Sequence, residues 1–209
     1  MKNTNDDDLW ISTADLMSGL MVIFLFIAIS MLSAQNKLVT TYQEGRGKIN
    51  ASLEELFNAH KGEYGITYNP EEMTATLPED MAFKAGSADL TPECQERLDK
   101  FMPTFIKILY DNRETIKEVN IEGHTSSEWY GAQTQDESYF NNMALSQSRT
   151  RGILRYVLEN GNLADYKEWM KTTIKANGLS FSNLKYKDGK EDAYASRRVE
   201  FKIVTSSEK

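Results

Sequence analysis

The pattern of hydrophobic and polar positions divides the chain into a long uncharged apolar run near its start and a mixed remainder. From Leu16 to Asn36 none of the 21 residues is charged. At a rise of about 1.5 Å per residue, a helix of this length covers about 30 Å, the thickness of a bilayer's hydrocarbon core. The pattern therefore predicts one transmembrane helix, which we place at residues 12–36 after a short tail at residues 1–11.

One carboxylate lies at the head of this apolar run. Ser12, Asp15, Ser18, Gly19 and Val22 recur at three- and four-residue intervals, so a helix places them on one face. Small residues let another helix approach closely in lipid. An ionised Asp at the bilayer centre costs roughly 2.5–3.5 kcal/mol on insertion scales, and an ionisable residue in a span is a candidate for function. The alternative is that Asp15 only marks the helix start, where acids are favoured.

After the apolar run the pattern changes to shorter segments. Residues 37–61 are interpreted as a linker, interrupted at Gly45 and Gly47, with helical spacing returning over 49–59. In the domain at 62–209, strands are predicted at 64–68, 73–77, 116–122, 172–177 and 198–204. Helices are predicted at 91–109, with Thr91 as the cap and Pro92 in the first turn, and at 142–159. Pro103 lies inside the first of these helices and is expected to kink or split it. The alternation predicts an α/β sandwich with a mixed sheet covered on one side by helices.

Composition excludes several classes of protein. The net charge of −7 argues against a general nucleic-acid binder, which needs a basic face. A single cysteine, Cys94, excludes an internal disulfide, and with two histidines the chain offers no metal-ligand spacing. No nucleophile–base arrangement is visible, so a hydrolytic enzyme is the least favoured class and no cofactor is expected.

The charges around the apolar run bear on targeting and orientation. Residues 1–9 contain Asp6, Asp7 and Asp8, whereas a signal peptide needs a positive start and a shorter apolar core, so a cleaved signal is the minor alternative. Lysines and arginines are more frequent after the run than before it. By the positive-inside rule, this weakly favours a cytoplasmic position for the C-terminal side.

The stretch around Asp15 resembles the single-helix signature of MotB-type stator subunits, and in particular ZorB of the Zorya anti-phage defence system: Trp10–Leu25 reads WISTADLMSGLMVIFL. In that family the Asp at this position takes up and releases a coupling ion, either a proton or sodium. The partner is a MotA- or ZorA-like multi-span subunit that forms a ring around a homodimer. The resemblance implies that Asp15 is the ion carrier of a rotary motor in the bacterial inner membrane. It also implies a cytoplasmic N-terminus and a periplasmic domain, against the charge rule, and we follow the resemblance.

Motifs in the second half resemble the OmpA-like peptidoglycan-binding domain. They are Ile121–Thr125 (IEGHT), Asn142–Arg149 (NMALSQSR) and Ser196–Glu200 (SRRVE), and Phe83–Leu90 is similar to the loop before that family's first long helix. The resemblance covers nearly all of residues 70–205. It implies that peptidoglycan is a partner and that the following residues bind it: Asn142, Leu145, Arg149 and Arg198.

The residue chemistry agrees with such a ligand. Stem peptides of peptidoglycan end in carboxylates, and an Arg fork holds a carboxylate through two hydrogen bonds. Other interpretations remain for each residue: core packing for Leu145, a surface ion pair for Arg149, and, for Arg197 and Arg198, that one shapes the pocket while the other faces solvent. His124 is expected to be a structural turn residue.

One position departs from the family pattern. Ser126 stands where the family has an Asp that contacts the amine of diaminopimelate. Glu128 or Asp136, in the insert between Ser127 and Asn141, are the alternatives for a negative group. The insert also carries aromatic residues, which form either a contact surface or a loop anchor.

Several functional readings remain after these assignments. The first is the motor subunit, serving anti-phage defence or, alternatively, a flagellum. The second is an OmpA-like envelope anchor without ion conduction, and the third is a TolR- or ExbD-like energiser. Residues 49–59 are the candidate for the plug that MotB-like stators can carry after the membrane helix. The alternative is a short helix packed on the domain or in a dimer.

Overall fold

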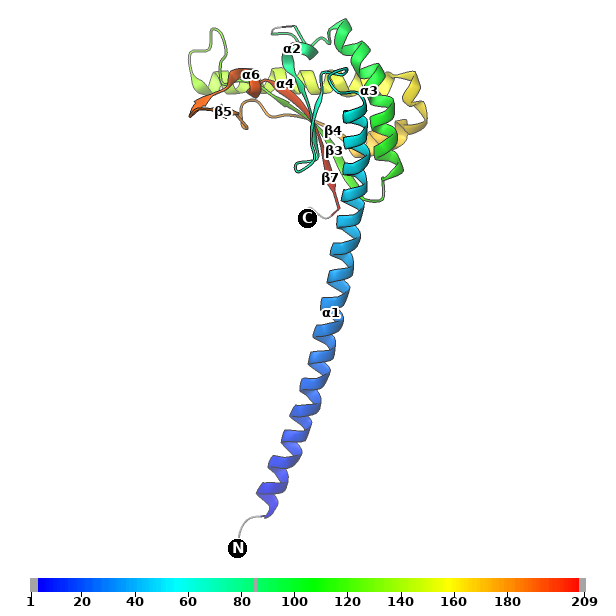
Figure 1. Cartoon of the computed structure of the whole chain (residues 1–209). Coiled ribbons are helices and arrows are strands. Elements are labelled where there is room, and N and C mark those ends of the chain that lie inside the picture. The colour runs from blue at the N-terminus through cyan, green and yellow to red at the C-terminus, as the bar shows by residue number, and fades with distance from the viewer. Residues whose placement is uncertain (1–3, 85, 207–209) are drawn as a thin grey trace. The chain divides into compact units, whose positions relative to one another are not determined.

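The computed structural model describes residues 4–84 and 86–206, and the chain divides into two compact units after Glu44. The first helix, α1, runs Thr4–Ala59 (Figure 1). Helical structure continues through Gly45 and Gly47, so the predicted interruption there is wrong. A glycine costs a helix interior only about 1 kcal/mol relative to alanine, which the burial of apolar residues in the following turns outweighs.

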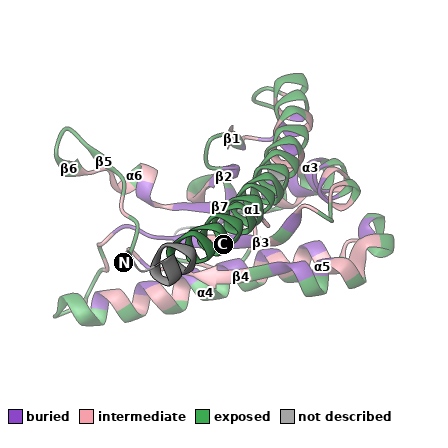
Figure 2. Ribbon diagram, turned by 90° about the horizontal axis from the view of Figure 1, so that it is seen from below, coloured by how far each residue is buried: buried purple, intermediate pink, exposed green. Residues whose placement is uncertain are grey.

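In the first unit, α1 exposes its apolar residues. Every side chain from Trp10 to Thr41 is exposed (Figure 2). By length and composition, this helix meets the requirements for crossing a membrane. A helix that is apolar on all sides is expected either in a protein core or in lipid. Because these side chains are exposed in the single chain, lipid or another subunit is the environment that suits them.

The second unit is built on a five-stranded mixed sheet, as predicted. The strand order is β1-β2-β7-β3-β4. Neighbouring strands are antiparallel except for the parallel pair β3 and β4. The strands run as follows: β1 Thr67–Asn69, β2 Thr74–Pro78, β3 Ile116–His124, β4 Ile174–Gly178 and β7 Arg198–Thr205. A separate hairpin joins β5 (Tyr186–Lys187) to β6 (Lys190–Glu191).

Helices cover one face of this sheet (Figure 1). Alternation along β7 shows the two faces: Val199, Phe201 and Ile203 are buried, whereas Lys202 between them is exposed. The ring of Phe201 lies 6.1 Å from that of Phe105 in α3. The remaining helices are α2 Glu79–Ala82, α3 Pro92–Asp111, α4 Gln135–Glu159, the 3₁₀ helix η1 Gly161–Tyr166, α5 Lys167–Thr173 and α6 Ala193–Ser196.

The predicted Thr91 cap of the first long helix is confirmed, whereas the predictions at Pro103 and at the start of α4 differ from the structure. Helix α3 begins after Thr91, whose hydroxyl accepts a hydrogen bond from Cys94 N, and passes through Pro103 without a break. Helix α4 begins at Gln135 rather than at 142, because Thr134 caps it by accepting from Glu137 N. Most of the aromatic insert is therefore helical or a short loop leading into α4.

The compact domain also begins earlier than the predicted residue 62. Ile49, Leu53 and Leu56, in the last turns of α1, belong to the domain's hydrophobic core. The ring of Phe57 stacks on Tyr68 of β1 at 5.2 Å. These contacts support the alternative in which residues 49–59 pack on the domain, while a plug role for them stays a prediction.

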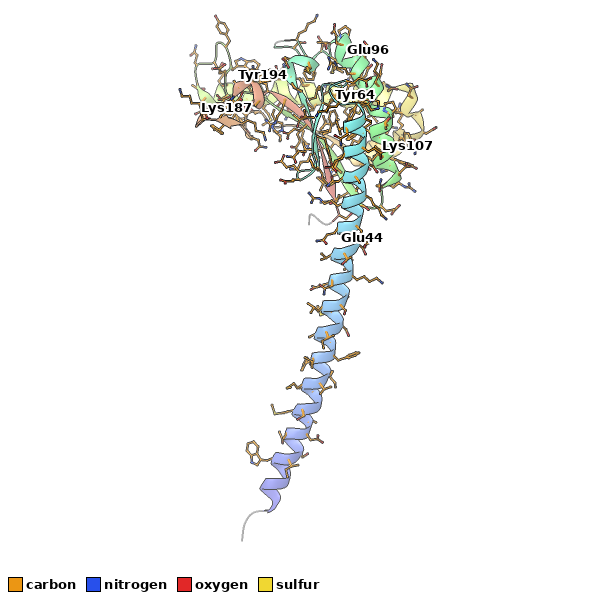
Figure 3. All side chains as sticks on the ribbon, viewed as in Figure 1. Glu44, Tyr64, Glu96, Lys107, Lys187 and Tyr194 are labelled. Carbon is orange, nitrogen blue, oxygen red and sulfur yellow. The ribbon has the colours of Figure 1, made fainter. Side chains whose placement is uncertain are left out.

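Helix α3 and the β5–β6 hairpin lie at opposite ends of the domain. In Figure 3, Glu96 and Lys107 mark α3, and Lys187 and Tyr194 mark the hairpin and α6. The site described below lies near α2, the start of α4 and α6, and is lined by residues from all three regions.

Candidate functional site

A pocket of about 450 Å³ brings together three of the four predicted peptidoglycan-binding residues. Asn142, Leu145 and Arg149 recur at three- and four-residue intervals on α4, so they share the helix face that forms one wall. The other walls come from α2, from the loop after β3 and from the end of α6. They are lined by Glu79, Gly86, Thr125, Ser126, Glu128, Trp129, Tyr130 and Arg197.

Arg149 is the most constrained side chain of the pocket. Only 3% of it is exposed, and its Nη2 donates to Glu79 Oε1 at 2.7 Å. Its Nε donates to Ser87 O at 2.9 Å, and its guanidinium carbon lies 5.0 Å from the centre of the Phe83 ring. A buried arginine needs such partners, because burying an unpaired charge is costly. The interpretation of Arg149 as a surface ion pair is therefore wrong, since the pair is buried.

Asn142 and Leu145 differ in their roles. Asn142 is buried, and its side-chain amide donates to Glu128 O at 3.3 Å, which ties the loop after β3 to α4. Leu145 is half-buried and lies outside the hydrophobic core, so it supplies the apolar part of the pocket wall.

Arg198 does not line this pocket, so the structure does not bring it together with the other three residues, and its role in peptidoglycan binding stays a prediction. Arg198 is the first residue of β7 and its Nε donates to Glu200 Oε1 at 2.6 Å, on the sheet face opposite the helices. It lines a different cavity, of about 750 Å³, with Glu122, Glu200 and Lys202. Successive residues of a strand point to opposite faces, so a shift of one residue decides the surface. Arg197, its neighbour, lines the candidate pocket instead.

His124 belongs to the network around Arg198. It is the last residue of β3 and 3% exposed, with its Nε2 at 3.3 Å from Glu200 Oε2 and 3.8 Å from Glu122 Oε2. Burial alone would raise the pKa of Glu200, but His124 and Arg198 lower it to about 2. The His and the two carboxylates offer ligand atoms within 4.8 Å of one another. Since Arg198 already neutralises Glu200, we interpret this cluster as a structural ion-pair network.

Of the two acids considered as substitutes for the family's Asp, only one lines the pocket. Glu128 lines the pocket and is exposed, whereas Asp136 lies in the first turn of α4, outside the pocket lining. Ser126 is buried in the wall. The aromatic insert is divided as well. Trp129 and Tyr130 line the pocket, while Tyr139 and Phe140 lie on α4.

Glu79 and Arg197 complete the pocket. Sequence reasoning left open which of Arg197 and Arg198 shapes the pocket, and it did not assign Glu79 to it. Glu79 is 70 residues from Arg149 in the chain, so the contact depends on the fold. The available signal was the acidic pair Glu79 and Asp80 directly after a predicted strand and before the loop at Phe83–Leu90.

The second candidate site is Asp15 on α1, in the other unit. Asp15 is exposed in the single chain. One turn further on, the Ser18 hydroxyl donates to Ala14 O at 2.7 Å, so it is satisfied within the helix and does not need a partner in lipid. On the small-residue face around Asp15, the Ser18 hydroxyl is therefore already hydrogen-bonded.

Comparisons with known proteins agree with both parts of the chain. The OmpA family model matches residues 82–197. The chain is 37% identical to Zorya protein ZorB of the Crooks strain of Escherichia coli, over 99% of this chain and 92% of that one. It is 27% identical to Zorya protein ZorB of Escherichia coli O139:H28, over 93% of this chain and 79% of that one.

A solved structure shares the fold. It is a putative MotB-like protein from Desulfovibrio vulgaris, with a TM-score of 0.57 and 22% identity over 79% of this chain and 94% of that one. The predicted fold class, a mixed α/β domain of OmpA type with one apolar N-terminal helix, is therefore confirmed. The chain belongs to the OmpA family and, within it, to the ZorB proteins with a MotB-like fold.

Proposed function

We propose that this chain is the cell-wall-anchored, single-pass inner-membrane subunit of an ion-driven rotary motor that serves anti-phage defence. The observation that carries the proposal is the single carboxylate, Asp15, at the head of an exposed, uncharged apolar helix in a ZorB protein. A simple envelope anchor has no use for an ionisable group at that place, since burying it in lipid is costly.

Asp15 carries the translocated proton or sodium ion in this proposal. Bound to the ion, the side chain is neutral and tolerates an apolar surrounding; released, it is charged and seeks a polar partner. Alternation between the two states moves it against a ring of MotA- or ZorA-like subunits. The small residues Ser12, Ser18 and Gly19 on the same face allow the ring's helices to approach Asp15 closely.

The domain is the anchor in the periplasm, with the N-terminus in the cytoplasm. The pocket around Arg149 supplies a buried guanidinium for a stem-peptide carboxylate, and Asn142 and Leu145 form the wall beside it. Anchoring to the wall holds a homodimer of this chain fixed while the ring moves. Peptidoglycan, the ring subunit and a second copy of the chain are thus the proposed partners.

The test is phage plating on cells that carry the whole operon, comparing wild type with Asp15→Asn. The substitution is nearly isosteric and removes only the ionisation. We expect loss of protection with unchanged amounts of protein in the membrane. The matched control is Asp7→Asn, which removes a carboxylate from the same helix outside the apolar run and is expected to keep protection.

Each outcome of the plating assay has a clear reading. Full protection by Asp15→Asn contradicts ion transfer at Asp15. Loss of protection by both variants shows that negative charge along the helix matters, not ion carrying by Asp15. No protection by wild type contradicts the defence role, and a swimming assay then tests the flagellar alternative.

A further inference from the structure

One carboxylate oxygen in the candidate pocket lacks a hydrogen-bond donor. Glu79 Oε1 accepts from Arg149, but among the described residues none donates a hydrogen bond to Glu79 Oε2, although the atom is buried. Arg197 Nε lies 3.6 Å from it, which is beyond a good hydrogen bond. Leaving a buried charged acceptor without a hydrogen-bond donor is costly, so this oxygen favours a donor that a ligand brings.

The position of Glu79 is fixed by the fold. It is the first residue of α2, its backbone N donates to Arg197 O at 3.2 Å, and its side chain is 14% exposed. Glu79 therefore lies between Arg149 and Arg197, and it lines both the 450 Å³ pocket and an adjoining cavity of about 290 Å³.

The charges of the pocket wall are balanced. Arg149 and Arg197 are positive, whereas Glu79 and Glu128 are negative. A ligand that carries only a carboxylate must take Arg149 from Glu79 and leaves Glu79 with Arg197, which lies 3.6 Å away, as its partner. A ligand that carries a carboxylate and an ammonium group exchanges partners instead: the carboxylate takes the Arg149 fork, and the ammonium takes Glu79.

We infer that Glu79 is a specificity-determining residue, which makes the pocket select zwitterionic ligands over simple carboxylates by exchanging Arg149 for a ligand ammonium. The inference rests on the proposed wall-anchoring function of this pocket. It assigns to Glu79 two effects of opposite sign: competition for Arg149, which weakens all carboxylates, and attraction of the ammonium, which restores affinity for zwitterions only.

The test uses the full-length chain in detergent micelles and two matched probes. One is the stem tripeptide that ends in meso-diaminopimelate, and the other is the same peptide with the free side-chain amine acetylated. Calorimetry gives the ratio of the two affinities for wild type and for Glu79→Gln. We expect Glu79→Gln to bind the acetylated peptide more tightly than wild type does. We also expect the preference for the peptide with the free amine, measured as the ratio of its affinity to that of the acetylated peptide, to fall at least tenfold.

Two further variants keep the result interpretable. Asp80→Asn removes the neighbouring, exposed acid of α2, which lies outside the lining of this pocket, and is expected to change the ratio less than twofold. Glu79→Ala removes both oxygens and must lower the ratio as Glu79→Gln does. Thermal unfolding of each variant checks that the domain stays folded.

The failures of the inference and of the proposed function are distinguishable. If wild type binds and Glu79→Gln keeps the wild-type ratio, the inference on Glu79 is refuted while wall binding stands. If Asp80→Asn lowers the ratio equally, the overall negative charge near α2 and not Glu79 sets the selectivity, which also refutes the inference on Glu79. If wild type binds neither peptide, the anchoring role of the pocket is refuted together with the inference.

Discussion

Replacing Glu200 by Gln should lower the stability of the domain by an amount that depends on pH. Glu200 is 12% exposed on β7, and its carboxylate contacts Arg198 and His124. Burial opposes its ionisation, but these two partners lower its pKa from 4.5 to about 2. At 1.36 kcal/mol per pKa unit, the difference corresponds to about 3 kcal/mol of unfolding free energy at pH 7.

The sign of the pH dependence follows from the lowered pKa. The folded state holds the proton of Glu200 more weakly than the unfolded state does, so the stabilisation is complete above about pH 4.5 and is lost as pH falls toward 2. Glu200→Gln cannot ionise. The variant should therefore be about 3 kcal/mol less stable than wild type at pH 7, and this deficit should shrink progressively below pH 4.5.

Urea unfolding of both proteins at pH 7, 5.5, 4 and 3, followed by near-ultraviolet circular dichroism, measures this deficit. Glu72→Gln is the matched control, because Glu72 is exposed and lines the same cavity as Glu200, and its effect should stay within about 0.5 kcal/mol at every pH. A deficit below 1 kcal/mol at pH 7, or one that is equal at pH 7 and pH 3, would refute the assignment of Glu200 to a stabilising ion-pair network.

Two further predictions concern α4. Arg149→Lys keeps the positive charge beside Glu79 but loses the planar fork, so the full-length variant should sediment with purified peptidoglycan at least tenfold less well than wild type. The control Arg151→Lys, at an exposed position, should bind as wild type does. Binding by Arg149→Lys equal to that of wild type contradicts the carboxylate-binding role of Arg149. Gly178→Ala places a Cβ 2.3 Å from Gln147 N, a backbone atom that cannot move alone, and should lower the unfolding free energy by about 1–3 kcal/mol or more. Gly161→Ala meets no atom within 4 Å and should change it little; equal effects of the two would mean that α4 shifts freely.

Much of the domain was predictable because its signals are local. The apolar alternation of the strands, the Thr91 cap and the motif on α4 each depend on residues that are close in sequence. Arg149 and Asn142 share a helix face by spacing alone, so a pocket wall containing both follows once the helix is assigned. The mixed sheet with helices on one face follows from the order of strands and helices in the same way.

The parts that sequence reasoning missed depend on long-range contacts or on a one-residue register. Glu79 meets Arg149 only because the fold brings the first residue of α2 to the helix face that carries Arg149, and no periodicity indicates this contact. Arg197 and Arg198 are adjacent, and the choice between the pocket and the open sheet face depends on where β7 begins. The helix through Gly45 and Gly47 shows tertiary burial overriding a weak local preference against glycine.

The position of β7 has a consequence for how the protein is made. This strand is formed by residues 198–205, yet it lies at the centre of the sheet, between β2 and β3. During synthesis from the N-terminus, β2 and β3 cannot be joined through β7 until more than seventy further residues have been added after β3. The nascent domain stays without its central ladder until almost all of it has been translated. For the periplasmic location proposed above, this delay is an advantage, because a domain that lacks its central strand cannot complete its sheet before it passes through an export channel.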